Sequence, residues 1–401
     1  MARSYDLVLY GATGFTGGLT AEYLARVAPE NTRWALAGRN LSKLAEVRRR
    51  LGPSWSDLPL LHADADDAGS LARLASSTRV VASTVGPYVK YGEPLVAACA
   101  TAGTDYTDLT GEPRFVDEMY LRHHATALRT GARIVHACGF DSIPADLGAW
   151  FTVQQLPAGH PLHVESFYRV SGRASAGTVH SLIGAVADAG ASRRAAAERR
   201  HRESVSAEPA DAAARAGAVD GGRRMAWVPR THPVGVWTVP MPTLDPQVVG
   251  RTAAALGWRD FSYGQYAALP SPLHVAGALA GTVAITAAAQ VAPLRDRMLG
   301  RFASGTGPTE EQRAAGWMSV KFTGVTDDGT RVLTEVHSDL DPGYASTAIM
   351  LGEASLCLAL DDLPPTVGQV TTAVAMGARL VERLDGAGIT FRVLRRWPAS
   401  S

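Results

Sequence analysis

Cysteine and unbalanced charge are both scarce in this sequence. Its 401 residues include three cysteines, Cys99, Cys138 and Cys357, which lie far apart along the chain. Their number and spacing exclude a thiolate zinc cage and favour a reducing compartment. Lys and Arg total 39 and Asp and Glu 38, so the net charge of +1 provides no broad field to attract nucleic acid. We therefore expect neither a metal site nor a nucleic-acid partner.

A signal peptide and a strongly apolar membrane span are also lacking. The first predicted strand begins within a few residues of Met1, so we expect a cytoplasmic protein. Residues 273–292 carry no charge and are long enough to span a membrane, but they are mostly Ala, Gly and Thr. We expect a helix buried in a second domain here. A helix that lines an apolar substrate channel or touches a membrane surface is the alternative.

The order of the apolar segments predicts a two-domain α/β protein. A chain of 401 residues exceeds one ordinary core, and 46% hydrophobic residues indicate a globular protein. Short apolar strands alternate with helical segments up to about residue 137, which predicts a parallel sheet with helices on both faces. The expected strands are 5–10, 33–37, 58–61, 79–84, 104–107 and 132–136. We assign residues 1–150 to this Rossmann-type, doubly wound domain.

The rest of the chain predicts a second, α+β domain that contains an antiparallel sheet. The segment "LHVESFYRVSG" is typical of a strand and "GTVHSLIGAVADAG" of a helix. Later, "WMSVKFTGVTDDGTRVLTEVHS" predicts two strands joined by a hairpin at Asp327-Asp328-Gly329. We place this substrate and oligomerisation domain at residues 151–343. A helical tail, 344–401, is expected to return to the first domain.

Two segments of the second domain bear on access to a substrate. Residues 191–222 are rich in Arg, Ala and Glu, and we expect a solvated helix followed by a mobile loop, with a lid over the substrate as the alternative. The segment "MAWVPRTHPVGVWTVPMP" suits an apolar substrate, although ordinary core packing is the more common reason for such a composition. Its large apolar residues are Met225, Trp227, Val236, Trp237 and Met241.

A glycine-rich turn follows the first predicted strand. In "LVLYGATGFTG" three glycines stand at the spacing G-x-x-G-x-x-G, just before a predicted helix. Glycine permits positive φ and close approach of the backbone to a ligand, and a helix start offers unpaired N–H groups with partial positive charge. This combination is typical of a site for the diphosphate of a dinucleotide. The predicted contacts are Gly11, Thr13, Gly14, Phe15, Thr16 and Gly17.

The end of the second strand predicts which dinucleotide binds. In this fold that position faces the adenosine ribose, where an acidic residue favours NAD and an arginine favours the 2′-phosphate of NADP. The sequence has Arg39 there, with Lys43 one turn later. A guanidinium pairs with phosphate through two N–H donors, so we predict NADP(H) as the cofactor. The remaining predicted cofactor contacts are Gly38, Asn40, Asp64, Thr84, Val85, Gly86, Pro87 and Tyr88.

Polar residues cluster where the fourth, fifth and sixth predicted strands end. Ligands of such sheets bind beyond the carboxyl ends of the strands, so these residues should share one edge. They come from "TVGPY", "GTDYTDLTGEP" and "HACGFDSIPADLG". As candidates for catalysis we take Tyr88, Tyr106, Asp141 and Ser142. A hydrogen-bond network that buttresses the site, and a helix cap in the case of Asp141, are the structural alternatives.

Several motifs carry a resemblance to a known family. In chain order, "GATGFTG", "AGRN", "GPYVKYGEPLVAAC", "GTDYTDLTGE" and "GFDSIPADLG" resemble the saccharopine dehydrogenase-like oxidoreductases. Within that group, "GPTEEQRAAGW", "DPGYASTAIMLGEASLCLAL" and "AMGARLVERLDGAGITF" are similar to bacterial trans-acting enoyl reductases. The resemblance implies NADPH-dependent reduction of acyl chains carried by partner polyketide synthases, in secondary or lipid metabolism. It assigns no catalytic residue.

Other reactions are less compatible with the residues. A short-chain ketoreductase needs Tyr four positions before Lys, and none of Lys43, Lys90 and Lys321 has one. Saccharopine chemistry on a C=N or C=O bond would require clustered Arg or Lys to bind several carboxylates. We therefore favour reduction of an activated C=C bond on an apolar or acyl-derived substrate. A protein that binds NADP(H) without catalysis remains an alternative, and a homodimer and peripheral membrane contact stay open.

Overall fold

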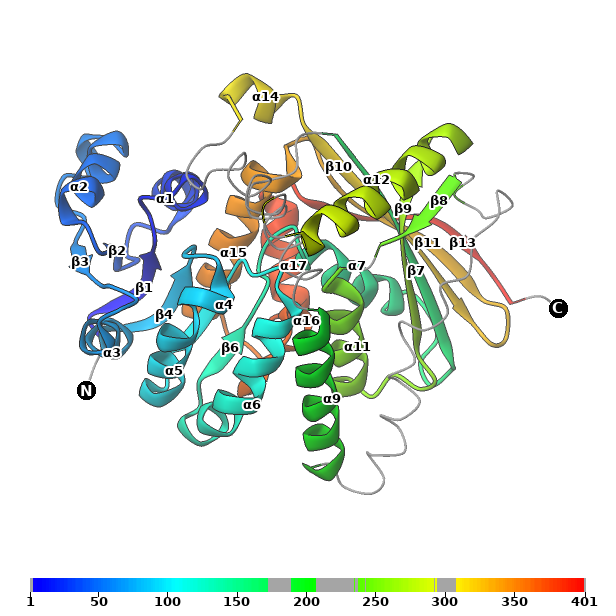
Figure 1. Cartoon of the computed structure of the whole chain (residues 1–401), viewed down its shortest axis with the longest axis horizontal. Coiled ribbons are helices and arrows are strands. Elements are labelled where there is room, and N and C mark those ends of the chain that lie inside the picture. The colour runs from blue at the N-terminus through cyan, green and yellow to red at the C-terminus, as the bar shows by residue number, and fades with distance from the viewer. Residues whose placement is uncertain are drawn as a thin grey trace.

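Two β-sheets with helices packed on them form the protein (Figure 1). The computed structural model describes residues 3–171, 189–206, 234, 237–241, 243–291, 293 and 308–399. Sheet A takes its strands from the N-terminal part of the chain and one strand, β12, from the tail; sheet B takes its strands from the later part. Helices packed between the two sheets join them.

Sheet A is a seven-stranded parallel sheet with the order β12-β6-β5-β4-β1-β2-β3. Its strands are β1 (Tyr5–Tyr10), β2 (Trp34–Gly38), β3 (Leu60–His62), β4 (Thr78–Ser83), β5 (Asp105–Asp108), β6 (Arg133–Val135) and β12 (Gly368–Val370). The six strands predicted from the N-terminal sequence are present. The order reverses between β1 and β4, which is the switch point where ligands bind in such sheets.

Helices cover both faces of sheet A. They are α1 (Phe15–Val27), α2 (Leu41–Arg50), α3 (Ala68–Ser77), α4 (Tyr88–Tyr91), α5 (Glu93–Ala102) and α6 (Pro113–Thr130), with η1 (Pro53–Trp55) and, from the tail, α15 (Thr347–Leu360). Alternate residues of β1 enter two different cores: Leu7 and Leu9 pack with α1 and α15, whereas Val8 and Tyr10 pack with α3 and α5. Burial on both faces explains the continuous apolar strands, and the predicted doubly wound sheet is confirmed.

Sheet B has six strands in the order β13-β11-β10-β7-β9-β8. They are β7 (Leu162–Ser171), β8 (Trp237–Pro240), β9 (Ser262–Leu269), β10 (Trp317–Thr326), β11 (Arg331–Ser338) and β13 (Thr390–Trp397). The predicted hairpin is formed by β10 and β11, and Gly329 in its turn has a positive φ of 87°. All neighbours are antiparallel except β7 and β9, so the sheet is mixed.

Four of the described helices pack between the two sheets. These are α7 (Ile143–Val153), α11 (Asp245–Ala255), α16 (Thr372–Ala375) and α17 (Gly377–Gly386). Two short helical segments stand elsewhere in the chain: α14 (Glu310–Ala314) precedes β10, and η2 (Pro342–Ser346) precedes α15. Asp146 of α7 is fully buried and accepts hydrogen bonds from Thr252 of α11 and from Thr372 (2.7 Å) and the Ala373 N–H (2.8 Å) of α16. One carboxylate thus ties three helices together at the junction.

The tail differs from the predicted helical segment. Residues 347–360 form α15 in the core beside sheet A, but residues 390–397 form strand β13, which pairs with β11 in sheet B. Gly388, with φ of 86°, stands between α17 and β13 and separates helix from strand. The tail therefore contributes to both sheets, because β12 also extends sheet A.

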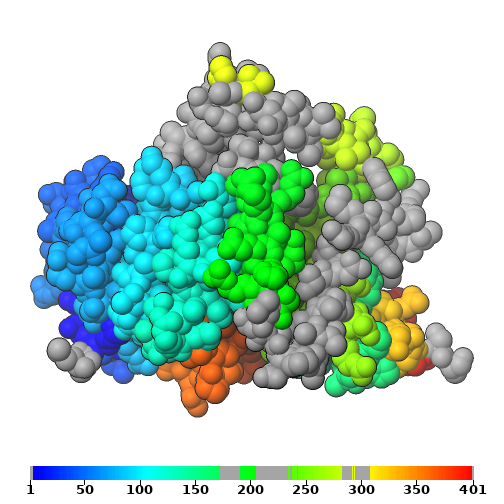
Figure 2. Space-filling model, turned by 60° about the horizontal axis from the view of Figure 1, so that its bottom comes forward, coloured from blue at the N-terminus to red at the C-terminus, as the bar shows by residue number. Residues whose placement is uncertain are grey.

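Helix α9 (Ala189–Ser206) is docked on the first domain rather than solvated on all sides. It lies against α6, beside which it runs on the face seen in Figure 2. The guanidinium of Arg199 is only 3% exposed; it stacks 3.9 Å from the ring of Tyr120 and reaches Asp117 at 3.5 Å. The prediction of a solvated helix is wrong for the side of α9 that packs on α6, because an ion pair between residues far apart in the chain cannot be read from local composition. Residues 207–222 lie outside the described residues.

The uncharged segment near residue 280 is a helix, but its first half is not buried. In α12 (Pro272–Gln290) Val275 is buried, whereas Leu273 is 80% exposed and Leu279 37% exposed. The prediction of a buried helix is wrong for this half, since only one side of it packs on β8 and β9. Among the described residues one helical stretch is long and apolar enough to cross a membrane, Pro342–Leu360, and 83% of its apolar window is buried inside the protein.

Substitution by alanine should have opposite effects on stability at two helical glycines, because only one of them packs against sheet B. A Cβ added at Gly148 of α7 would lie 2.3 Å from Cζ of Phe322, whereas one at Gly250 of α11 would meet no atom within 4 Å. We expect Gly148→Ala to lower the free energy of unfolding by about 1–3 kcal/mol through overpacking. Gly250→Ala should raise it by roughly 0.5–1 kcal/mol because Ala favours helix. Urea unfolding of both variants checks this, and an unchanged Gly148→Ala protein would contradict the packing described.

Candidate active site at the carboxyl edge of the parallel sheet

The turn between β1 and α1 brings three backbone segments into contact. Gly11 has φ of +92°, in the region that only glycine adopts freely, and its N–H donates to Ala37 O at 2.9 Å. A Cβ on Gly17 would lie 2.3 Å from Gly11 O and 2.7 Å from Thr84 Oγ1. Thr84 Oγ1 in turn donates to Gly11 O at 3.1 Å. The tight turn therefore requires glycine at both positions.

The turn leaves the start of α1 open to a ligand. Gly14 is the N-cap residue of α1 and no side chain caps the helix. Thr13 and Gly14 are exposed, and Phe15 and Thr16 are partly exposed. The ring of Phe15 packs edge-on against Tyr344 with centroids 4.9 Å apart, and the guanidinium of Arg313 lies 5.5 Å from the Phe15 ring centroid. Free N–H groups at an exposed helix start, next to a glycine turn, fit a dinucleotide diphosphate.

Arg39 and Lys43 stand free at the end of β2. Both side chains are exposed, and among the described residues neither makes a side-chain hydrogen bond or an ion pair. Asn40 caps α2 by accepting from the Lys43 N–H at 2.9 Å, so the role seen for its side chain is structural. Asp64 accepts from the Asp66 N–H at 3.2 Å. Arg39 thus remains available for the 2′-phosphate, and its assignment stays a prediction.

Glu112 holds the 84–88 segment in place. The carboxylate accepts hydrogen bonds from the N–H groups of Tyr88 (2.9 Å) and Val89 (2.8 Å) at the start of α4. Gly86 and Pro87 are exposed, and Thr84 and Val85 are half-buried beside Gly11. This segment presents its backbone at the same edge as the glycine turn, where the sequence predicts contact with the cofactor.

The two candidate tyrosines do not face an open site. The Tyr88 hydroxyl donates to Ser83 O (3.0 Å) and accepts from the Leu109 N–H (3.1 Å), and its ring is buried. Tyr106 is fully buried, and its hydroxyl has no hydrogen-bond partner among the described residues. Burial and the charge of Asp108 raise the pKa of both hydroxyls well above the usual value. Their positions favour structural roles.

A buried acid–imidazole pair holds the loop after β6. Asp108 Oδ2 lies 2.7 Å from His136 Nδ1, and Oδ1 accepts from the N–H groups of Ala137 (2.9 Å) and Thr110 (3.1 Å). Ala137 has φ of 59°, a left-handed conformation that is costly for alanine and is held by this hydrogen bond. His136 Nε2 is buried without a partner among the described residues. His136 is not among the site residues predicted from the sequence, although its position directly after β6 already places it at this edge of the sheet.

Ser142 links the first domain to sheet B. Its hydroxyl donates to Asp245 Oδ1 at 3.0 Å, while Asp245 Oδ2 accepts from Thr243 (3.0 Å) and from Gln265 Nε2. Asp245 is 3% exposed, and burial raises its pKa to about 6 against the lowering effect of these donors. Asp245 was not predicted as a site residue, because only the fold brings it to Ser142.

Asp141 is the one carboxylate of this group that no described residue binds. It is half-buried, directly before Ser142, and has no hydrogen-bond or ion-pair partner in the described part of the chain. Burial, with the nearby charges of Asp245 and Asp108, raises its pKa to about 7. Helix α7 begins just after it, where the N–H groups of Ser142 and Ile143 both donate to Gly139 O. Asp141 can therefore hold a proton near neutral pH and release it.

The geometry thus separates the predicted site residues into three groups. The glycine turn, Arg39 and the 84–88 segment follow β1, β2 and β4 at the carboxyl edge of sheet A, where the sequence predicts the nucleotide. Ser142 bonds to Asp245, and Asp141 lies directly before Ser142, between the end of β6 and the start of α7. Tyr88 and Tyr106 are buried supports. Of the apolar residues predicted for the substrate, Trp237 and Met241 are partly buried; Met225, Trp227 and Val236 lie outside the described residues.

Comparison with known proteins agrees with the prediction that this chain binds a dinucleotide. Residues 7–135 match the model of the saccharopine dehydrogenase NADP-binding domain. A trans-acting enoyl reductase of Mycobacterium ulcerans is 37% identical, and a protein of Mycobacterium tuberculosis that bears the same name provisionally is 39% identical; each match covers 98% of both chains. Saccharopine dehydrogenase of Saccharomyces cerevisiae has the same fold, with a TM-score of 0.56, 13% identity, and coverage of 98% of this chain and 100% of that one. The predicted NADP(H) cofactor is confirmed by the domain match.

The exposed Arg39 predicts which pyridine cofactor loses affinity on substitution. Arg39→Ala should weaken NADPH binding by about 10- to 100-fold, because a charge-assisted pair with the 2′-phosphate is lost. NADH lacks that phosphate, so its affinity should not change. Calorimetric titration of wild type and variant with both nucleotides measures this. Unchanged NADPH affinity would show that another group binds the 2′-phosphate.

Proposed function

This chain belongs to the family of the trans-acting enoyl reductases and is an NADP-dependent oxidoreductase, and we propose that it reduces the activated C=C bond of an acyl-derived substrate. The observation that carries the proposal is the place of Asp141, a half-buried carboxyl without a partner among the described residues, at the carboxyl edge that also bears the nucleotide turn. Such a reduction needs a hydride at the β carbon and a proton at the α carbon.

The cofactor supplies the hydride when it is bound, and the residues of the chain have the remaining tasks. Gly11, Gly14 and Gly17 would admit the diphosphate, and Arg39 would bind the 2′-phosphate. Ser142 and Asp245 hold the start of α7 next to Asp141 through their 3.0 Å hydrogen bond. In the proposed reaction, the proton of the Asp141 carboxyl passes to the α carbon of the enolate, and solvent restores it.

The charges at this edge support a substrate without several carboxylates. Beyond the ends of β5 and β6 lie Asp108, Asp141 and Asp245, and none of them forms an ion pair with a described Arg or Lys side chain. Even with Asp141 protonated, the acidic groups of Asp108 and Asp245 in a low-dielectric setting would repel a polycarboxylate. A thioester-linked acyl chain is neutral at its reacting end. We therefore extend the proposal to an acyl chain bound to a carrier as the substrate.

A substrate panel tests the proposed reaction. The purified protein is mixed with NADPH and with matched enoyl thioesters, imines and ketones, and loss of nicotinamide absorbance is followed. We expect turnover of the enoyl thioesters, increasing with acyl length. Turnover of imines or ketones alone would replace this proposal with C=N or C=O reduction, and NADPH oxidation by no member of the panel would contradict it.

Asp141 predicts a pH dependence of the rate. Since its pKa is about 7, the protonated form declines as the pH rises through 7, and the reduction rate should fall with it. Asp141→Asn should lower kcat by about 100-fold or more and abolish this pH dependence. NADPH affinity serves as the control and should stay within about twofold. A variant with wild-type kcat and pH profile would exclude Asp141 as the proton donor.

Asp141→Asn should lower the rate but raise the stability of the folded protein at high pH. The pKa of the Asp141 carboxyl is raised in the folded state, so the folded protein holds the proton more tightly than the unfolded chain, and stability falls as the pH rises from about 4 to about 7. At about pH 8 Asp141→Asn should therefore be more stable than wild type, because the variant has no carboxyl group to ionise in the folded state. At about pH 4 the difference should vanish. Urea unfolding at both pH values measures it; a variant less stable at the higher pH would contradict this assignment.

A further inference from the structure

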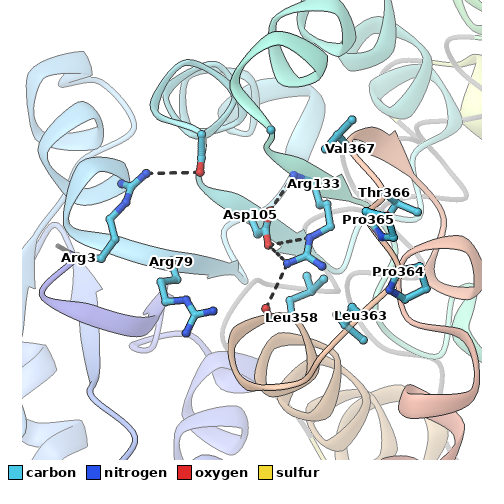
Figure 3. A pocket seen from close by; sticks show the side chains of 12 residues that line it. Arg3, Arg79, Asp105, Arg133, Leu358, Leu363, Pro364, Pro365, Thr366 and Val367 are labelled. Atoms are coloured by element: carbon cyan, nitrogen blue, oxygen red, sulfur yellow. Dashed lines mark hydrogen bonds and ion pairs between the residues drawn. The ribbon is translucent and has the colours of Figure 1, made fainter. Parts of the chain in front are cut away.

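A polar cavity lies at the opposite, amino edge of sheet A. It has a volume of about 350 Å³ and is lined by the starts of β4, β5 and β6 and by the loop that follows α15. Figure 3 shows the arginines and Asp105 on one side, and Leu363 to Val367 on the other. Parallel strands carry their cofactor at the carboxyl edge, so this cavity is separate from the nucleotide site.

The cavity carries a surplus of positive charge. Its lining includes three guanidinium groups, Arg3, Arg79 and Arg133, and one carboxylate, Asp105, which leaves a net charge of +2. The neighbouring carboxylate of Asp6 is already paired with Arg33 at 2.7 Å. A phosphate monoester carries a charge of about −1.5 to −2 at neutral pH and matches this surplus.

The three arginines differ in how many of their donor groups already have partners. Arg3 donates to the carbonyl oxygens of Ala75 (2.7 Å) and Ala102 (2.5 Å), which makes it a structural anchor. Arg133 binds Asp105 through Nε at 2.9 Å and through Nη2, so Nη1 is left. Arg79 is exposed and has no hydrogen-bond or ion-pair partner among the described residues.

The far wall adds one donor and an apolar surface. The Thr366 hydroxyl oxygen is buried and has no hydrogen-bond partner among the residues that the structure describes. Leu358, Leu363, Pro364 and Val367 provide apolar atoms around it. A buried hydroxyl without a partner is costly unless a ligand or water binds it.

We propose that this cavity binds a small organic phosphate monoester, held by Arg79, Arg133 Nη1 and the Thr366 hydroxyl. Donors from opposite walls suit the tetrahedral oxygens of a phosphate better than a planar carboxylate, because Asp105 already occupies the paired donors of Arg133. The cavity is larger than phosphate alone, and the Leu358–Val367 wall would pack against the organic part.

Phenyl phosphate is the probe for this site. The protein is first saturated with NADP⁺, so that the nucleotide site cannot bind the probe, and is then titrated by calorimetry with phenyl phosphate and with benzoate. We expect saturable one-to-one binding of phenyl phosphate, with benzoate at least about tenfold weaker. Absence of saturable binding into the millimolar range, or equal affinity for benzoate, would overturn the proposal.

Variants locate the binding. Arg79→Ala should weaken phenyl phosphate by about tenfold, and Thr366→Val should weaken it less, because a charge-assisted pair is stronger than a neutral hydrogen bond. Arg73→Ala is the matched control: its side chain is 74% exposed on α3 and does not line the cavity. Melting temperatures without the probe should be equal in Arg79→Ala and wild type. Weakening by Arg73→Ala as large as that by Arg79→Ala would show nonspecific attraction and overturn the proposal.

Discussion

The close contact of Gly17 with the carbonyl oxygen of Gly11 is the constraint on which the nucleotide edge depends. No side chain fits between α1 and the end of β1, where an added Cβ would lie 2.3 Å from that oxygen. The helix start is consequently exposed and uncapped next to a backbone turn, and Thr84 at the end of β4 closes the other side. The predicted binding of a diphosphate at this turn rests on backbone geometry rather than on any charged side chain.

The chemistry at the neighbouring strand ends depends on carboxylates held in different ways. Asp108 is saturated by His136 and two backbone N–H groups, and Asp245 by Ser142, Thr243 and Gln265. These donors keep their charges in place, and the charges act with burial on Asp141, which has no donor of its own in the described residues. Burial first, and the charges of these two carboxylates second, raise the pKa of Asp141 to about 7, the range that the proposed general acid requires.

Local patterns in the sequence predict the sheet well and the site only in part. The apolar runs, the glycine turn and the Asp-Asp-Gly hairpin are short-range signals, and each produced the expected element. The direction of the Tyr88 hydroxyl, the approach of Asp245 to Ser142 and the docking of Arg199 depend on segments far apart in the chain. The sequence predicts helix where strand β13 forms, because the pairing partner of this strand, β11, is distant in sequence.

Isotope transfer tests the central claim, that this edge combines NADPH with a proton donor to reduce a C=C bond. NADPH deuterated at the transferable C4 position should place deuterium at the β carbon of an enoyl thioester in ordinary water. Unlabelled NADPH in D₂O should place it at the α carbon, delivered through Asp141. Label from the cofactor at neither carbon of the product would contradict the proposed reaction.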